Sequence, residues 1–213
     1  MTVNVQRLTE GARPALKAHF LALPAEDRRL RFGSSLSAES IAAYVDRIDF
    51  ERGAAFGLYD DDLALIGAAH LAYGDDSAEL GISVLPSARD RGVGGALFAR
   101  AVEHARNRSI SRLYMHCLAE NAAIMHIARR NGMDIVTASG DADAHLELSP
   151  ASYASITGEM LTDRLALCDY ALKANAAAWR GLQASLEDTA LRSGRAACDE
   201  SDASGPRVPE LAR

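Results

Sequence analysis

The chain has 213 residues, is 48% hydrophobic and 24% charged, and carries a formal net charge of −6 at pH 7. These values fit one globular domain with an appendage, and the negative charge argues against a nucleic-acid-binding protein. No apolar run approaches the roughly 20 residues that span a membrane, and the N-terminus lacks an apolar signal region. The three cysteines are odd in number and widely spaced, which favours reduced thiols over disulfides or zinc. We therefore expect a cytoplasmic protein that binds neither membrane nor nucleic acid.

The N-terminal part of the chain predicts one strand, two helices and a charged connection. Residues 3–8 alternate as a strand does, residues 10–23 and 38–48 have helical patterns, and Ser37 is a suitable N-cap for the second helix. The connection, residues 23–32, places arginines beside two carboxylates. It fits either a solvated, salt-bridged turn or a loop that contacts substrate.

Five further strands are predicted, at residues 54–59, 63–73, 77–84, 134–138 and 145–148. The breaks between the first three are short enough for hairpins, so we expect these strands to be antiparallel. The break Asp60-Asp61-Asp62 resembles a set of metal ligands, but aspartate is also favoured at hairpin tips for its turn chemistry. We expect a turn there and no metal.

The most informative stretch is a strand, a glycine-rich loop and a helix. One face of the strand carries Leu80, Ile82 and Val84, and the other carries Glu79, Gly81 and Ser83. The loop places arginines and glycines at the helix N-terminus: Arg89, Arg91, Gly92, Gly94 and Gly95. A helix N-terminus presents unpaired N–H groups and a partial positive charge, so it binds anions. The expected ligand is a di- or polyphosphate.

Two common phosphate-binding loops do not fit this stretch. The P-loop of ATPases needs a Lys and a Ser or Thr after its last glycine, whereas Gly95 is followed by Ala96 and Leu97. A dinucleotide loop needs a third glycine where Leu97 stands, within a parallel βαβ series. A phosphate-loop oxidoreductase is therefore the least favoured function.

The pattern Arg89-x-x-Gly92-x-Gly94, between a strand ending Val84-Leu85-Pro86 and an amphipathic helix, resembles the acyl-CoA-binding motif of the GNAT superfamily of N-acetyltransferases. Downstream, residues 113–118 look like that family's next strand. Residues 121–133 are similar to its following helix, which opens with Asn and closes on Gly. The charged connection before residue 33 resembles a segment of the branch that includes protein-lysine acetyltransferases.

The resemblance implies an α/β (α+β) fold, with a mixed, mostly antiparallel twisted sheet flanked by helices, over residues 1–150. It also implies acetyl-CoA as co-substrate. The backbone of Val84 and Leu85 would then pair with the pantetheine, and Asn121 would contact its far end. The pyrophosphate would be held by two side chains and the loop backbone: Arg89, Arg91, Gly92, Val93, Gly94, Gly95 and Ala96.

Acyl transfer to an amine needs a neutral amine, a polarised carbonyl and a protonated leaving thiolate. The resemblance implies direct attack in a ternary complex. Glu79 is the lone carboxylate on its strand, and half-burial near the sheet's centre would suit a general base. The alternative is a strand-edge glutamate that faces solvent. His116, near the end of the next strand, is the alternative base, and a hydrogen-bonded core histidine is equally consistent. Cys117 fits a small buried hydrophobe better than a nucleophile.

One position departs from the family's pattern. Many GNAT enzymes carry a tyrosine seven residues after the helix-opening asparagine, where it protonates the CoA thiolate; here Ala128 occupies that position. Water, Tyr114 or Ser83 would then supply the proton, or the thiolate would leave unaided.

The C-terminal part of the chain has a different pattern. Apolar residues with one asparagine alternate spacings of four and three, as in a heptad seam: Leu161, Leu165, Cys168, Leu172, Asn175, Trp179, Leu182 and Leu186. We expect an amphipathic helical extension over residues 151–192 and a disordered tail over 193–213. The seam would pack on its own domain or on a second copy of the chain, although Gly158 and Gly181 weaken a single unbroken helix.

The sequence therefore predicts an N-acetyltransferase that moves an acetyl group from acetyl-CoA to a primary amine, either on a small molecule or on a protein lysine. The alternative is a catalytically weak CoA sensor or interaction module that acts through its C-terminal helix. Ala128 favours the second function, whereas Glu79 and the complete glycine loop favour the first.

Overall fold

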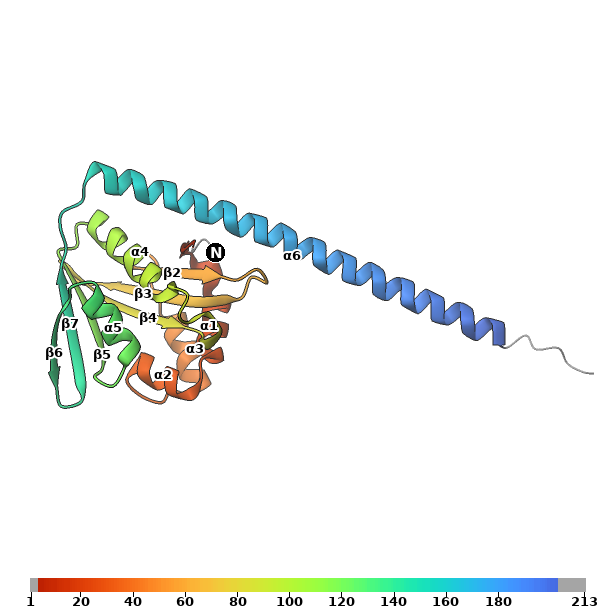
Figure 1. Ribbon diagram of the computed structural model, residues 1–213, viewed down its shortest axis with the longest axis horizontal. Helices are drawn as coiled ribbons and strands as arrows, with labels where there is room; N and C mark the ends of the chain where they lie inside the picture. The colour runs from red at the N-terminus through yellow and green to blue at the C-terminus, as the bar shows by residue number, and fades with distance from the viewer. Residues whose placement is uncertain (1–3, 203–213) are drawn as a thin grey trace, which may run out of the picture. The chain divides into compact units, whose positions relative to one another are not determined.

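The computed structural model describes residues 4–202, without the side chains of 184 and 187–202 (Figure 1). Its seven-stranded sheet has the order β1-β2-β3-β4-β5-β7-β6. Neighbouring strands are antiparallel except β4 and β5, which are parallel, so the predicted mixed, mostly antiparallel sheet is confirmed. The strands are β1 Gln6–Leu8, β2 Gly53–Tyr59, β3 Leu65–Tyr73, β4 Ser77–Val84, β5 Arg112–Leu118, β6 Asp134–Ala138 and β7 Asp141–Glu147.

Helices cover both faces of this sheet (Figure 1). The helices among the described residues are α1 Arg13–Ala22, α2 Ala25–Phe32, α3 Ala38–Asp46, α4 Val93–Asn107, α5 Ala122–Arg130 and α6 Tyr153–Asp202, with short 3-10 turns at Glu10–Ala12 and Pro86–Ala88. Ser37 caps α3 as predicted, its hydroxyl oxygen accepting the Ser40 N–H at 3.2 Å. The charged connection at 23–32, for which the sequence left a salt-bridged turn or a loop open, mostly forms the helix α2.

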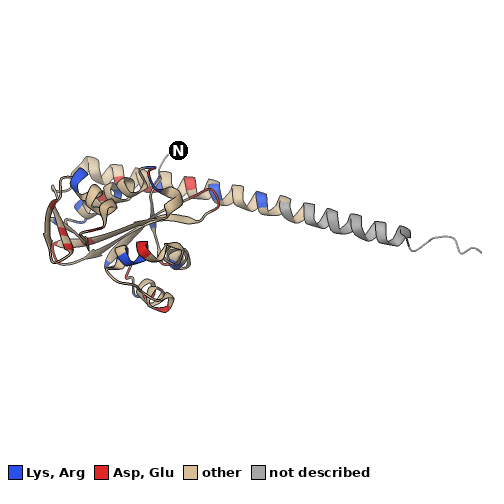
Figure 2. Cartoon of the chain, turned by 60° about the horizontal axis from the view of Figure 1, so that its bottom comes forward, with Lys and Arg blue, Asp and Glu red and all other residues tan. Residues whose placement is uncertain are grey.

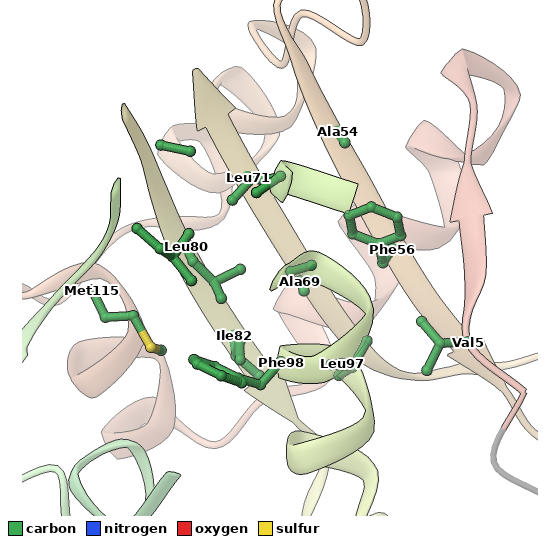
Figure 3. Packing of buried hydrophobic residues seen from close by; sticks show 14 of the residues in the cluster. Val5, Ala54, Phe56, Ala69, Leu71, Leu80, Ile82, Leu97, Phe98 and Met115 are labelled. Carbon is green, nitrogen blue, oxygen red and sulfur yellow. The ribbon is translucent and has the colours of Figure 1, made fainter. Parts of the chain in front are cut away.

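The predicted alternation of β4 separates the two cores. Leu80 and Ile82 pack against Leu97 and Phe98 of α4, within a cluster that also includes Met115 of β5 (Figure 3). The opposite face of the sheet is covered by a second cluster that α1 and α3 supply. The polar face of β4, which carries Glu79, therefore lies on the side of α1, α2 and α3.

Helix α6 runs unbroken through Gly158 and Gly181, contrary to the weakening that these glycines suggested. It includes residues 193–202, which composition assigned to a disordered tail; residues 203–213 lie outside the described part. The chain divides into two compact units, Met1–Ala171 and Leu172–Arg213, and the division between them falls within α6. The first turns of α6 belong to the first of these units.

A buried arginine of α4 holds the first turns of α6 against the domain. Arg100 of α4 is only 3% exposed and bonds Glu159 at 2.9 Å and Asp163 at 2.5 Å. The Glu159 carboxylate also lies 2.5 Å from Nδ1 of His104 and accepts a hydrogen bond from Asn107 at 2.6 Å. A buried charge pair that loses one partner leaves the other uncompensated. Glu159 is thus the centre of the contact between α4 and α6.

We expect Glu159→Ala to lower the free energy of unfolding by about 3 kcal/mol, because it strips a buried guanidinium of one of its two close carboxylates. Chemical denaturation measures the change. The matched control is Glu103→Ala, whose carboxylate lies 3.9 Å from Arg100 and should contribute less than about 1 kcal/mol. Equal effects of the two variants would contradict this role of Glu159.

The same carboxylate makes this contribution pH-dependent. Burial acts to raise the pKa of Glu159, but hydrogen bonds from His104, Asn107 and Arg100 outweigh it and lower the pKa to about 2. A pKa lowered by folding stabilises the protein above the unfolded-state value of about 4.5, and this stabilisation is lost as the pH falls toward 2. The difference in unfolding free energy between wild type and Glu159→Ala should therefore shrink below about pH 4.5, as measured by denaturation at several pH values.

Candidate active site

The N-terminus of α4 is open to an anion. Its N-cap is Gly92, whose φ of +78° favours glycine, and no side chain caps this end of the helix. The Ala96 N–H already donates to Gly92 O at 3.0 Å, so the first-turn donors are those of Val93, Gly94 and Gly95. A Cβ at Gly95 would meet nothing within 4 Å, which leaves room beside these donors. The arrangement can bind a phosphate group through backbone N–H groups.

Two arginines flank this helix end. The guanidinium of Arg89 pairs with Asp27 of α2 at 2.5 Å, and its side chain is 45% exposed. Arg91 is exposed, and its Nη1 donates to the Ser87 carbonyl at 3.5 Å. A polyphosphate at the helix end would compete with Asp27 for Arg89.

The parallel pairing of β4 with β5 is short. It joins residues 77–79 of β4 to residues 112–114 of β5, although the strands continue to Val84 and Leu118. Within residues 4–202, no strand pairs with the β5-facing edge of β4 beyond Glu79. A slender ligand that offers amide groups can pair with such an edge.

Backbone direction decides which residues of β4 face the open edge. The Leu85 N–H donates to Ile66 O of β3 and its carbonyl accepts from Ala88, both at 2.9 Å. Backbone groups alternate sides along an antiparallel strand, so those of Ile82 and Val84 point away from β3. A Cβ at Gly94 would lie 3.8 Å from Val84 and 2.9 Å from Ile127 of α5, which places the α4 N-terminus at the end of this edge.

Asn121 has structural partners. Its Oδ1 caps α5 by accepting the Ile124 N–H at 3.2 Å, and its Nδ2 donates to the Leu30 carbonyl of α2 at 3.3 Å. The residue is 6% exposed. It joins α5 to α2 and thereby positions both beside the open edge.

The polar face of the central strands holds both predicted bases. Glu79 stands beside Tyr114 in the β4–β5 register, and His116 lies two residues further along β5. Glu79 is exposed and not half-buried, because the helices that cover this face pack elsewhere over the sheet. An exposed carboxylate on this face remains accessible to an incoming amine.

His116 belongs to an acidic neighbourhood. Its Nδ1 lies 2.5 Å from Asp143 Oδ1 on β7, and acidic residues mark the strands of the β6–β7 hairpin (Figure 2). The hydrogen bond with Asp143 raises the pKa of His116, and the charges of Asp143, Asp141 and Glu79 add to the effect. The imidazole therefore stays protonated to higher pH than an ordinary histidine and can donate a proton as well as accept one.

Asp143→Asn should lower the pKa of His116 toward its ordinary value of 6.5, because it removes the carboxylate that stabilises the imidazolium. An NMR titration of the histidine ring protons measures the change. Asp141→Asn, which removes a more weakly acting charge, serves as the control. An unchanged titration in Asp143→Asn would contradict the contact.

Ser83 and Cys117, which the sequence offered for proton transfer and nucleophilic attack, are both buried. His19 is buried, which lowers its pKa to about 4; its Nδ1 bonds Leu65 O at 2.7 Å, so Nε2 accepts the Ser83 hydroxyl proton at 2.8 Å. Cys117 is buried and burial raises its thiol pKa. Ala128 is fully buried in α5. Tyr114, in contrast, is partly exposed next to Glu79.

The structure brings together a cluster beside Gly81, from three elements, that the sequence analysis did not identify. Arg31 of α2 donates to the Tyr44 hydroxyl of α3 at 3.2 Å, and that hydroxyl lies 2.9 Å from Nδ1 of His70 on β3. Two features of the sequence could have indicated this cluster: the arginines of residues 23–32, and a histidine on a face of β3 that otherwise carries small side chains. Neither feature by itself shows that these residues contact each other.

Two other expectations concern features outside this site. Asp60 Oδ1 accepts the N–H groups of Asp62 and Ala64, which is the predicted turn chemistry. In the part of the chain that the structure describes, no three His, Cys, Asp or Glu side chains are grouped to hold a metal. None of the described helices combines the length and apolar character that crossing a bilayer requires.

Comparison with known proteins places this geometry in a family. The model of the acetyltransferase (GNAT) family matches residues 22–133, and a search of curated sequences gives no match. The GNAT domain of S. lividans PAT is similar in fold, with a TM-score of 0.59 and 20% identity over 68% of this chain and 89% of that one.

Two further solved structures share the fold. The ribosomal-protein-S18-alanine N-acetyltransferase of Escherichia coli gives a TM-score of 0.54 at 21% identity, over 71% of this chain and 97% of that one. A phosphinothricin acetyltransferase from Sinorhizobium meliloti, solved with AcCoA, gives 0.57 at 16% identity, over 72% and 95%. With the family model matching more than half of its length, the chain belongs to the GNAT acetyltransferase family.

Proposed function

We propose that this protein is an acetyl-CoA-dependent N-acetyltransferase. The observation that carries the proposal is the uncapped N-terminus of α4 at the end of the open edge of β4, the strand that also presents Glu79. The phosphate site thus lies at one end of β4, and it is followed along the strand by unpaired backbone groups and then by the Glu79 carboxylate. This order suits a nucleotide thioester that delivers its acyl group beside the carboxylate.

The N–H groups of Val93, Gly94 and Gly95 hold the pyrophosphate, with Arg89 and Arg91 adding cationic donors. Ala96 supports the loop through its bond to Gly92 and is not needed as a donor. The pantetheine amides pair with the backbone of Val84 and, because Leu85 is already bonded on both sides, with that of Ile82. Asn121 contributes indirectly, because it holds α5 beside the open edge of β4 where the pantetheine binds.

The reaction is direct attack of the amine on the thioester carbonyl. The amine nitrogen forms a bond to the carbonyl carbon, the carbon–sulfur bond breaks, and the nitrogen loses one proton. Glu79 accepts that proton directly or through one water, and His116 is the alternative acceptor. The CoA thiolate takes up a proton from Tyr114 or water, since Ala128 offers none.

Calorimetric titration of acetyl-CoA tests the cofactor site. We expect binding that needs the pantetheine arm, because the open edge of β4 contributes as well as the α4 N-terminus. The control is the nucleotide portion of CoA without pantetheine, which should bind far more weakly. Equal affinities would contradict the strand assignment, and no binding of either would contradict the loop.

The alternative function, an interaction module, is favoured by one observation on α6. Within the first unit, Leu161, Leu165 and Cys168 are exposed, while Glu159 and Ala166 face the domain. A different stripe from the predicted seam therefore packs on the domain. The seam continues in the second unit with Leu172 and Trp179, which are 71% and 65% exposed.

We propose that a second copy of the chain covers this seam in a parallel coiled coil. In that geometry a residue at heptad position g faces position e of the next heptad in the partner. Arg164 occupies such a g position and Asp169 the corresponding e position, so opposite charges meet twice across the two-fold axis. Asn175, within the seam, would fix the register. Dimerisation is compatible with catalysis, because Glu79 lies on a different element.

Size-exclusion chromatography with light scattering should show a dimer. Leu172→Glu combined with Leu182→Glu should give a monomer, because both changes place charge within the seam. Ala177→Glu, on the opposite side of the heptad, is the matched control and should remain dimeric. A monomeric wild-type protein at micromolar concentration would contradict the proposed pairing.

A further inference from the structure

We infer that the acceptor is an amine that also carries a carboxylate, and that Arg31 binds this carboxylate beside Gly81. The inference rests on the proposed function and names the acceptor class for that site. It concerns the cluster of Arg31, Tyr44 and His70, which the cofactor and the proton transfer leave unused.

The guanidinium of Arg31 lies directly on the polar face of β4. A Cβ at position 81 would overlap it, so the close approach requires glycine there. Gly81 and Glu79 share this face and are two residues apart, which corresponds to about 7 Å along a strand. The cation is thus held within the length of a small molecule from the proposed base.

The surroundings of Arg31 fix its orientation. Its guanidinium carbon lies 5.1 Å from the ring centre of Phe32, 5.8 Å from that of Phe20 and 5.9 Å from that of Tyr44. Nη2 donates to the Tyr44 hydroxyl at 3.2 Å, which leaves the hydroxyl proton for Nδ1 of His70 at 2.9 Å. Cation–π contacts and a directed hydrogen bond keep the planar group in place before any ligand arrives.

This positive charge has no counter-ion among the described residues. None of their carboxylates lies within ion-pair distance of Arg31, and its Nε is buried without a hydrogen-bond partner. Arg29 of the same helix, in contrast, pairs with Glu26 and Glu120. The imidazole of His70 adds no second positive charge near neutral pH, because burial and then the charge of Arg31 lower its pKa to about 4. A part-buried guanidinium with free donors matches the two oxygens of a carboxylate.

The opposite charge lies further along the same face. Glu79 is followed by His116 and Asp143 toward the acidic β6–β7 hairpin. An amino carboxylate therefore meets a cation with its acidic end and carboxylates with its amine. A polyamine or a basic peptide would instead bring a second cation toward Arg31. Amino acids, or peptides with a carboxylate near the amine, fit this distribution best.

The test compares acceptors that differ only in the carboxylate. Free amino acids and their amides are offered with acetyl-CoA, and kcat/KM is measured from CoA release. We expect the preferred amino acid to exceed its amide by about 10- to 100-fold, the range of a charge-assisted hydrogen-bond pair. Arg31→Gln should abolish this preference, mainly through KM. Arg47→Gln, an exposed arginine on the same layer at the end of α3, is the matched control and should retain it.

Arg31→Lys distinguishes the effect of the charge from that of the planar geometry, and it serves as a control for misfolding. It keeps the cation but loses the planar fork, so we expect an intermediate preference with acetyl-CoA affinity and thermal unfolding unchanged. Amides and polyamines used as well as amino acids, or a preference that survives Arg31→Gln, would overturn the inference and leave the proposed function standing. No CoA release with any amine, despite acetyl-CoA binding, would overturn both.

Discussion

Gly94→Val is expected to lower acetyl-CoA affinity by at least about 100-fold, equivalent to about 2.7 kcal/mol. A Cβ at this position already lies 2.9 Å from the side chain of Ile127 and 3.8 Å from Val84. The two further methyl groups of valine would fill the junction between the α4 N-terminus and the open edge of β4. Phosphate could then not approach the first-turn N–H groups, and the pantetheine could not pass. Calorimetry measures the loss directly.

Gly11→Val is the matched control, because a Cβ there meets only the Thr9 hydroxyl at 3.9 Å. It should bind acetyl-CoA like the wild type. Thermal unfolding distinguishes a blocked site from a misfolded chain, since Ile127 is a flexible side chain that can move aside at moderate cost. A folded Gly94→Val protein with wild-type affinity would show that the cofactor binds elsewhere.

Glu79→Gln is expected to lower kcat by about 10²- to 10⁴-fold with little change in acetyl-CoA affinity. The substitution keeps the size and the exposed position of the side chain but removes its capacity to accept a proton. CoA release under saturating acetyl-CoA gives kcat, and calorimetry gives the affinity. An exposed carboxylate needs no rearrangement of the fold to reach an incoming amine.

His116→Asn is the companion variant for this prediction. Loss of rate in Glu79→Gln but not in His116→Asn would assign the proton transfer to Glu79. The reverse result would transfer the role to His116, whose pKa is raised by Asp143, and the pH–rate profile would then shift in Asp143→Asn. An unaltered rate in both variants would leave proton removal to water and contradict the assignment of either side chain.

Local signals predicted the part of the fold that lies around β4. The alternation along β4 predicted that the face with Leu80 and Ile82 is buried, and these two residues do pack on α4. Short hairpin breaks fixed the antiparallel order of β2, β3 and β4. The glycines after Arg91 predicted where α4 begins. Gly92 has the left-handed conformation and is the N-cap that directly precedes the helix.

The rest depended on contacts between distant segments. The exposure of Glu79 follows from where α1 to α3 pack, which its own strand does not encode. The bonding of Leu85 to Ile66 and Ala88 depends on strand register, and a one-residue shift would have exchanged its role with that of Val84. Arg31 and His70 are 39 positions apart in the sequence, and only the packing of α2 over Gly81 brings them together.

Helix α6 shows the same difference between what local spacing predicts and what contacts with distant segments decide. The heptad spacing correctly indicated an amphipathic helix, and two glycines do not interrupt it. Spacing alone did not reveal that Glu159, Asp163 and Ala166 form a second face that packs on the domain. That face contains charged residues, and it is buried because Arg100 and His104 provide their partners.

The measurement that tests the central claim most directly follows acetyl transfer itself, with mass spectrometry of the products and a thiol assay for CoA in the same reaction. The proposed function predicts one N-acetylated amine for each CoA released, and no product when Gly94→Val replaces the wild type. Acetyl-CoA that binds tightly without forming an N-acetyl product on any amino acid, polyamine or lysine peptide would contradict it. The site would then be that of a CoA-binding module.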